Sequence, residues 1–452
     1  MRTAVQHYSL LYRAGVFLIL LILGLILYEL ALSSWNTPVE LRAYDMLLRM
    51  RPLQTVRNDI VILAIDEKTT AELGALPWSR AVHARILRAL QRTNARYIVY
   101  DVLFSEPDTE HPGADRAFWR AMTTRKDVFL PMIYDPLREP SWDPADLRAL
   151  ILLEKFAHTR RIIYAGNTPM HRYYYFLPPW ADFISAARGV GMAVTPSNAS
   201  PVVRQAQLAD LTIVKYPVPS QPLPTNIPLP KLTDQTVVIP GLPLVVSQAV
   251  MDVEKDLVQV DFGNSITFLA DLQPYVEIPI DEAGGMMINY AGPAGSYPYV
   301  SAIDFLEGRV DTSLVDDKIV FVGITDPATI LPAILRTPYG LMPRVEATAN
   351  SVATILDRSY IARSRQDMLA AMLILAIILG LLPAIVPRWD LAPMGLALGL
   401  TYIVIAVLVL ALFRHALPVI PALILILLGS AAAAFLKPAL FLPEGGVVIE
   451  EE

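Results

Sequence analysis

Acidic side chains follow two short apolar segments of the sequence, at the points where those segments end. The segments are Asp59–Ile65 and Tyr97–Val102. The acidic residues are Asp66, Glu67, Asp101, Glu106 and Asp108. Ligands of open α/β sheets bind beyond the carboxyl ends of the strands, and carboxylate oxygens suit hard cations such as Ca²⁺ or Mg²⁺. These five residues are therefore candidate ligand-binding positions; the alternative is that they cap helices and pair with Arg80, Arg85 or Arg88.

Aromatic side chains form a second group of candidate contact residues. Tyr173, Tyr174, Tyr175 and Phe176 are consecutive, and Trp180 follows closely. Aromatic clusters on loops serve as contacts for ligands or partner proteins. The alternative is that some of these rings pack into the core and the others cover its edge.

Signatures of established enzyme classes do not occur in the sequence. There is no phosphate-binding glycine–lysine loop, no HExxH helix and no GxSxG elbow. The six histidines have no pair at metal-ligand spacing, and the chain has no cysteine. We therefore assign no catalytic residue, no metal site and no cofactor, and expect a protein that is not an enzyme. An unrecognised hydrolase using Asp66 and Asp101 is the remaining enzymatic hypothesis.

The apolar runs predict the elements that position the acidic residues. Residues 59–65 and 97–102 are short enough to be buried strands, and Ser79 can cap a helix over Ala81–Leu90 between them. Strand, helix and strand in this order form a parallel crossover unit. Further apolar runs at 128–133, 162–165 and 319–322 are expected to extend the same sheet. The pattern predicts an α/β domain with a mixed, mostly parallel sheet.

Two local patterns predict flanking structure. Glu40–Met50 has helical spacing of apolar residues. Gly284–Gly285 separates two apolar runs and resembles a hairpin turn.

Four segments are long and apolar enough to cross a bilayer. They are Ala14–Leu32, Met368–Val386, Leu391–Phe413 and Ala416–Leu436. Hydrophobic residues make up 54% of the 452 residues and charged residues 18%, which is unlike an ordinary soluble enzyme. We interpret the first segment as an uncleaved anchor and the other three as a compact bundle.

Charges flanking these segments predict the orientation. Arg2 and Arg13 precede the first segment, which favours a cytoplasmic N-terminus. The expected organisation is a tip and anchor over residues 1–35, an extracytoplasmic domain over 36–365, a three-helix bundle over 366–437 and a cytoplasmic tail over 438–452. The formal net charge of −6 gives no electrostatic case for nucleic-acid binding.

Several ordered motifs resemble one family, the type-two CHASE sensor domain of bacterial cyclases and kinases. They are DIVILAIDEKTTAELG at Asp59–Gly74, LPWSRAVHARIL at Leu76–Leu87, YDVLFSEPD at Tyr100–Asp108, IPIDEAGGMMINYAGPAG at Ile278–Gly295, YPYVSAIDFLEGRV at Tyr297–Val310, DKIVFVGIT at Asp317–Thr325 and RTPYGLMPRVEATANSVATIL at Arg336–Ile355. The resemblance covers most of residues 35–436. Three positions depart from the family pattern. Arg344 stands where a glycine is usual, Thr348 stands where a histidine is common, and Ser197–Ser200 follows Thr195–Pro196 where an acidic turn is usual.

The resemblance implies a sensory domain in the inner membrane of a bacterium, facing the periplasm or exterior. Family members commonly continue into a cyclase or kinase domain, whereas here about 15 residues follow the last apolar segment. We therefore expect a sensor that binds a ligand or partner and signals to a separate membrane or cytoplasmic effector, with a homodimer as one possible state. The alternative is an accessory subunit of a larger membrane complex, whose neighbours would contact the aromatic segment.

Overall fold

The computed structural model describes residues 18–19, 22–29, 37–135, 148–149, 152–153, 155–158, 160–172, 176–196, 200–214, 235–328, 333–362, 365–385 and 391–436. The chain divides into two compact units. One unit is formed by Leu53–Tyr360, and the other by Met1–Pro52 together with Ile361–Glu452. Each unit is described by itself.

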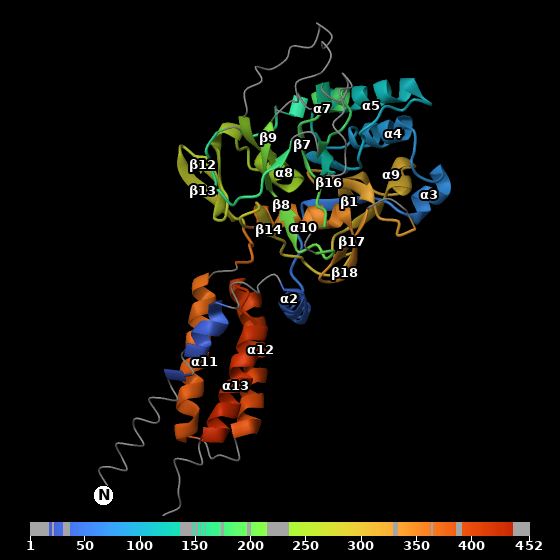
Figure 1. Cartoon of the computed structure of the whole chain (residues 1–452). Helices are drawn as coiled ribbons and strands as arrows, with labels where there is room; N and C mark the ends of the chain where they lie inside the picture. The colour runs from blue at the N-terminus through green and yellow to red at the C-terminus, as the bar shows by residue number, and fades with distance from the viewer. Residues whose placement is uncertain are drawn as a thin grey trace, which may run out of the picture. The chain divides into compact units, whose positions relative to one another are not determined.

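The unit Leu53–Tyr360 is built on a seven-stranded sheet (Figure 1). Its strands are β1 (Ile60–Ile65), β2 (Tyr97–Asp101), β3 (Val128–Tyr134), β6 (Phe176–Leu177), β7 (Gly189–Met192), β15 (Tyr299–Ser301) and β16 (Ile319–Ile324). The order is β15-β1-β16-β2-β3-β6, with β7 also paired to β3. Every pairing is parallel except β3 with β6, so the predicted mixed, mostly parallel sheet is confirmed.

Alternation along the strands separates the core into two layers, one on each face of the sheet. Val61, Leu63 and Ile65 face one cluster, whereas Ile60 and Ile62 face the other. The first face is covered by α4 (Arg80–Leu90), α5 (Pro112–Arg125), α7 (Ala181–Ala186) and α9 (Ala302–Leu306). The second face is covered by α8 (Leu242–Val250) and α10 (Arg344–Leu356). Burial on both faces explains why the strands read as continuous apolar runs.

The crossover from β1 to β2 passes through α3 (Glu67–Leu73) and α4. The Ser79 hydroxyl accepts a hydrogen bond from the Ala81 amide, so the predicted cap of α4 is confirmed. β16, which lies more than 200 residues later in sequence, sits between β1 and β2 and pairs with both. The runs at 128–133 and 319–322 join this sheet as predicted.

Two predictions about strand partners are wrong. The run at 162–165 supplies β4 (Ile162–Ile163), which pairs with β11 (Val258–Asp261) in a separate sheet, β13-β12-β11-β4. The turn at Gly284 does not close a hairpin, because β13 (Gln273–Pro279) pairs with β12 (Ser265–Ala270) while β14 (Gly285–Met287) pairs with β8 (Gln205–Gln207). In each case a strand distant in sequence takes the place of the expected partner, β11 for β4 and β8 for β14.

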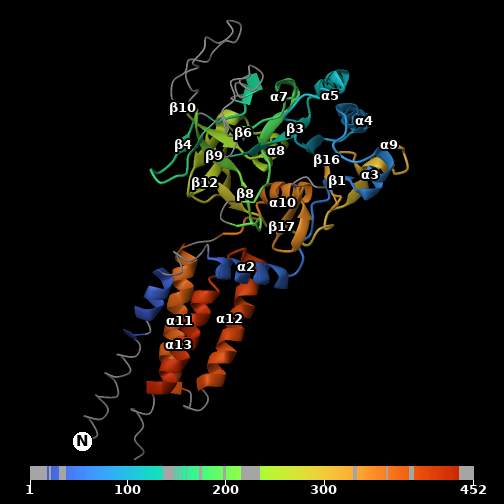
Figure 2. The same ribbon diagram turned by 45° about the vertical axis from the view of Figure 1, so that its right-hand side comes forward.

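Two further small sheets complete this unit. β10 (Gln235–Pro240), β9 (Ala209–Val214) and β5 (His171–Arg172) form one sheet, and β17 (Ile334–Thr337) pairs with β18 (Gly340–Pro343) in the other. Short 3₁₀ helices lie at Lys255–Leu257 and Thr312–Leu314. β9 and β17 lie on different sides of this unit in both views (Figures 1 and 2).

The second unit is helical. It contains α2 (Pro38–Met50), α11 (Arg365–Ile385), α12 (Leu391–Phe413) and α13 (Ile420–Leu436), with further helical residues at 22–29. The predicted helix at 40–50 is thus confirmed as α2. α13 packs against both α11 and α12. The Glu40 carboxylate accepts hydrogen bonds from the amides of Val419 and Ile420 at 2.8 and 2.9 Å, which fixes α2 to the start of α13.

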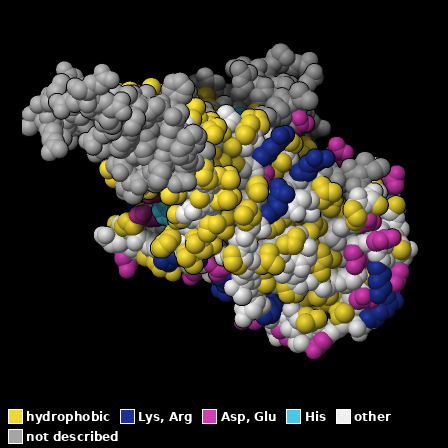
Figure 3. Space-filling view, turned by 90° about the horizontal axis from the view of Figure 1, so that it is seen from below, with side chains coloured by type: hydrophobic (Ala, Val, Ile, Leu, Met, Phe, Trp, Pro, Cys, Tyr) yellow, Lys and Arg dark blue, Asp and Glu magenta, His cyan; other side chains and the backbone are white. Residues whose placement is uncertain are grey.

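Hydrophobic side chains point outward from these helices. Leu396, Leu400 and Leu412 of α12 are 69%, 59% and 71% exposed. Seen from below, hydrophobic side chains cover much of the described surface (Figure 3). Among the described residues, one helix, Pro393–Phe413, is long and apolar enough to cross a membrane, and shorter apolar helices run over Gln366–Leu381 and Ile420–Ala431.

Four membrane-spanning segments were predicted, and one passes this test. α11 and α13 cover most of two other predicted segments, and the apolar helices found in them among the described residues are Gln366–Leu381 and Ile420–Ala431. Much of the first segment, Ala14–Leu32, lies outside the described residues.

Candidate functional site

The parallel strands bring their carboxyl ends to one edge of the main sheet. Asp101 ends β2, Asp66 follows β1, Ser301 ends β15, and Asp326 follows β16 closely. Two of these four residues were predicted from sequence. Ser301 and Asp326 were missed, although Asp326 follows a run that was recognised as a strand.

Asp66 is held by hydrogen bonds from its own unit. Its Oδ1 accepts from the Thr69 amide at 2.9 Å and from the Ser301 hydroxyl at 3.0 Å. The first bond caps α3, and the second ties β1 to β15. Asp326 is held similarly, by the Thr70 hydroxyl at 3.0 Å and the Ala328 amide at 2.9 Å. Both carboxylates therefore organise the loops at this edge.

Asp101 forms a buried ion pair with Arg344, the first residue of α10. Nε of Arg344 lies 3.0 and 3.2 Å from the two carboxylate oxygens, and Nη2 donates to the Asp101 carbonyl at 3.2 Å. The Thr348 hydroxyl lies 3.5 Å from the same carboxylate. The side chains of Asp101 and Arg344 are only 1% and 9% exposed. Two of the positions that depart from the family pattern, Arg344 and Thr348, thus meet at one predicted site residue.

Glu346 fixes the same end of α10 to a neighbouring loop. Its carboxylate accepts from the amides of Gly295 and Ser296 at 3.0–3.1 Å and from the Tyr299 hydroxyl at 2.7 Å. Glu346 is completely buried. The start of α10 is therefore tied to β2 through Arg344 and to the segment entering β15 through Glu346.

The other three predicted carboxylates lie apart from the Asp101–Arg344 ion pair. Glu67 is exposed in the first turn of α3, and Glu106 is exposed in the loop after β2. The Asp108 carboxylate accepts from the amides of Arg80 and His111 at 3.2 and 2.9 Å. Burial alone would raise the pKa of Asp108, but hydrogen bonds from His111, Ser79 and Arg80 hold it below its usual value.

The five predicted carboxylates do not converge on one point. Within the described ranges, no group of three His, Cys, Asp or Glu side chains is arranged to hold a metal ion. Asp66 caps α3 and Asp108 accepts from the Arg80 amide at the start of α4, as the alternative interpretation of helix capping expected. Asp101 pairs with Arg344, a residue more than 240 positions away in sequence, and not with Arg80, Arg85 or Arg88.

The aromatic candidates also separate. Tyr173, Tyr174 and Tyr175 lie outside the described residues. Phe176 is fully buried in β6, where it belongs to the core. Trp180 is partly exposed at the N-terminus of α7, and its amide donates to the Phe104 carbonyl at 2.6 Å.

A cleft of about 820 Å³ opens beside Trp180, in the size range of small-molecule sites. It lies between α5 and α7 and adjoins the loop that follows β2. Its lining includes two of the predicted residues, Asp108 and Trp180. The lining also holds residues that the sequence did not single out, namely Asp115, Arg116, Trp119, Arg120, Arg148 and Asp182.

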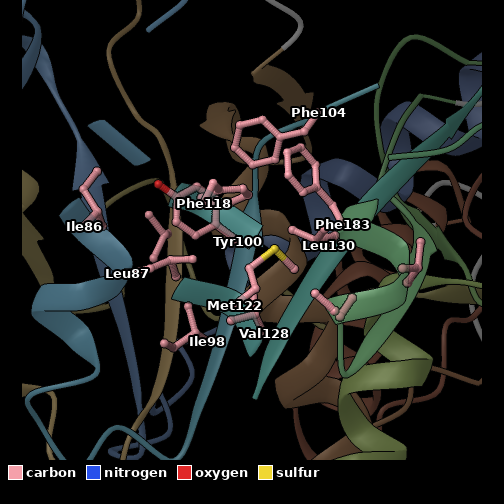
Figure 4. Packing of buried hydrophobic residues seen from close by; sticks show 14 of the residues in the cluster. Ile86, Leu87, Ile98, Tyr100, Phe104, Phe118, Met122, Val128, Leu130 and Phe183 are labelled. Atoms are coloured by element: carbon pink, nitrogen blue, oxygen red, sulfur yellow. The ribbon is translucent and has the colours of Figure 1, made fainter. Parts of the chain in front are cut away.

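The floor of the cleft is part of the aromatic core. Phe183 lines the cleft and packs edge-on against Phe118 with ring centroids 5.1 Å apart. Phe104 and Phe118 are 4.8 Å apart, and Tyr100 of β2 lies 5.8 Å from each (Figure 4). Because interiors are close-packed, this floor is rigid. Through Tyr100, which precedes Asp101, the aromatic floor also connects the cleft to β2.

His83 of α4 is buried in the same aromatic cluster. Its Nδ1 lies 2.9 Å from the Tyr100 hydroxyl, and its ring is 4.9 Å from that of Phe104. Burial, and next the charge of Arg80, lower the pKa of His83 to about 3. His83 is therefore neutral near pH 7 and serves as a packed hydrogen-bonding side chain.

Comparison with known proteins identifies the class. A family model, the CHASE2 domain, matches residues 17–385. No curated protein and no solved structure matches the chain. The match spans well over half of the sequence, so the chain belongs to the CHASE2 family of extracytoplasmic sensory domains, as its motifs predicted.

Proposed function

We propose that this protein is a membrane-anchored sensor. Its α/β domain binds a ligand or partner outside the cytoplasm of a bacterial cell and signals through its membrane helices to an effector. The observation that carries this proposal is membership of the CHASE2 family, whose domains are sensory.

The character of the helices supports a membrane location. Only 17% of the apolar window of α12 is buried, although this window is almost entirely apolar. An exposed apolar surface of this kind is costly in water and favourable in lipid. We propose that the predicted anchor segment Ala14–Leu32 and the helices α11, α12 and α13 all span the inner membrane, with the α/β domain facing the periplasm or exterior.

The connection from α10 to α11 supplies a route for the signal. Arg344 and Glu346 tie the start of α10 to the sheet, and only residues 357–364 separate the end of α10 from α11. A ligand shifts the equilibrium between two states only if it binds them with different affinities. We propose that such a ligand changes the packing of the anchor helix against α11.

Engineered disulfides can test this proposal, because the chain has no cysteine of its own. A Cβ at Gly24 would lie 3.3 Å from Cβ of Ala376, close to disulfide geometry. The full-length variant Gly24→Cys/Ala376→Cys is treated with an oxidant in isolated membranes. The rate of disulfide formation is measured with and without concentrated growth medium and periplasmic extract. We expect an active extract to change the rate of cross-linking.

A matched pair inside the bundle serves as the control. A Cβ at Gly429 would lie 3.4 Å from Cβ of Leu379, so Leu379→Cys/Gly429→Cys links α11 to α13 and should react at an unchanged rate. Equal changes in both pairs, or no change in either with any extract, would contradict signalling by movement of the anchor helix.

A further inference from the structure

We propose that the cleft between α5 and α7 binds a small ring-bearing oxyanion, such as an aromatic carboxylate or phosphate. This inference deepens the sensor function proposed above by naming the class of ligand, and it rests on that function for its biological meaning. The cleft lies beside the loop after β2, on the side where parallel α/β sheets bind ligands.

Two arginines supply positive charge that would complement the negative charge of an oxyanion. Arg116 and Arg120 lie one turn apart on α5, and both are exposed and line the cleft. Neither forms an ion pair with any residue that the structure describes. A guanidinium presents paired donors that match the two oxygens of a carboxylate or phosphate. Two adjacent guanidinium groups that form no ion pair within the described ranges are therefore available to an oxyanion.

The acidic residues of the cleft are already engaged. Asp182 pairs with Arg148 at 3.2 Å, and Asp115 lies 3.8 Å from Arg80 and accepts from the Asp108 amide at 2.8 Å. Asp108 accepts from the amides of Arg80 and His111. Asp108 and Asp182 thus have amide or cationic partners, and Asp115 has one oxygen on an amide while its other oxygen faces Arg80 without a hydrogen bond. Arg116 and Arg120, in contrast, form no ion pair with a described residue.

Tryptophans supply the apolar contacts. Trp119 lies between the two arginines on α5 and is 37% exposed, and Trp180 lines the cleft from the start of α7. An exposed tryptophan beside arginines on a rigid aromatic floor is suited to stack on a planar ring. The combination selects a ligand with both a ring and an oxyanion, in preference to a bare inorganic ion.

Binding of simple probes to the full-length protein in detergent tests the inference. Intrinsic tryptophan fluorescence is titrated with benzoate, phenyl phosphate, inorganic phosphate and benzyl alcohol. We expect benzoate or phenyl phosphate to bind saturably, with inorganic phosphate and benzyl alcohol at least about tenfold weaker. Preference between the first two probes identifies the oxyanion as carboxylate or phosphate.

Variants locate the site. Arg116→Gln/Arg120→Gln should weaken binding about 100-fold, because each lost charge-assisted contact is expected to cost at least about tenfold in affinity. Arg85→Gln/Arg88→Gln removes the same charge from exposed positions on α4 that do not line the cleft, and should bind normally. Trp119→Leu should weaken binding and reduce the fluorescence change.

The inference is overturned if neither ring-bearing anion binds, or if the α4 variant loses as much affinity as the α5 variant. Failure of sensing is distinguishable from failure of the site. Binding of the probes without any change in Gly24→Cys/Ala376→Cys cross-linking would leave the site standing and count against signalling.

Discussion

The buried pair of Asp101 and Arg344 provides the sharpest test of how the sheet is joined to α10. Asp101→Asn removes the carboxylate charge but keeps its shape, and leaves the guanidinium of Arg344 nine-tenths buried without its counter-charge. Removing one partner of a buried ion pair costs about 3–5 kcal/mol. Arg344→Met leaves the Asp101 carboxylate buried, with the Thr348 hydroxyl 3.5 Å away. We expect each single variant to lower the free energy of unfolding by about 3–5 kcal/mol.

The double variant separates the pair from simple loss of packing. In Asp101→Leu/Arg344→Met both charges are gone and apolar groups fill the space, so the loss should be smaller than the sum of Asp101→Leu and Arg344→Met by about 2–3 kcal/mol. The assay is urea unfolding of the full-length chain in detergent, followed by near-ultraviolet circular dichroism of the α/β domain. Single variants within about 1 kcal/mol of the natural chain, or strictly additive losses, would refute the assignment of a coupled buried pair.

Two other perturbations test the core. Gly323→Ala places a methyl group 2.5 Å from Cβ of Val345 on α10 and should destabilise the domain by about 1–3 kcal/mol in urea unfolding, whereas Gly113→Ala, which meets nothing within 4 Å, should change stability by less than about 0.5 kcal/mol. Equal effects of the two glycine variants would contradict the described packing. Burial lowers the pKa of His83 to about 3 in the folded state, compared with 6.5 ordinarily. Between these two pH values the imidazole takes up a proton only in the unfolded chain. The free energy of unfolding therefore falls as the pH is lowered through this window. His83→Gln should remove about 2 kcal/mol of the loss between pH 6.5 and 5, and an unchanged pH slope would show that His83 is not buried and neutral.

The sequence predicted those elements whose periodicity and caps are local. β1, α4 and β2 follow from short apolar runs and a serine cap, and Asp66 and Asp101 lie at strand ends as predicted. The insertion of β16 between β1 and β2 could not be predicted, because three apolar strands give no signal of their order. The same limit explains the misplacement of residues 162–165 into the main sheet.

The site was predicted less completely than the fold. Arg344 and Thr348 were marked only as departures from the family pattern, and nothing local indicated that both reach Asp101. The arginines of α5 were not singled out from the sequence, because nothing local distinguishes them from any other exposed arginines on a helix. The proposed contacts to a ligand also need Trp180, which lies at the start of α7 about 60 residues further along the chain.

The central claim is that the α/β domain lies outside the cytoplasm and that the apolar helices cross the membrane. Because the chain contains no cysteine, single cysteines can be placed against a clean background. Ser313→Cys lies on the exposed surface of the domain, and Ser9→Cys lies in the N-terminal tip. A hydrophilic maleimide small enough to pass an outer membrane should label Ser313→Cys in intact cells, and Ser9→Cys only after the inner membrane is permeabilised. Protection of Ser313→Cys with labelling of Ser9→Cys in intact cells would contradict the proposed topology and, with it, the sensor function.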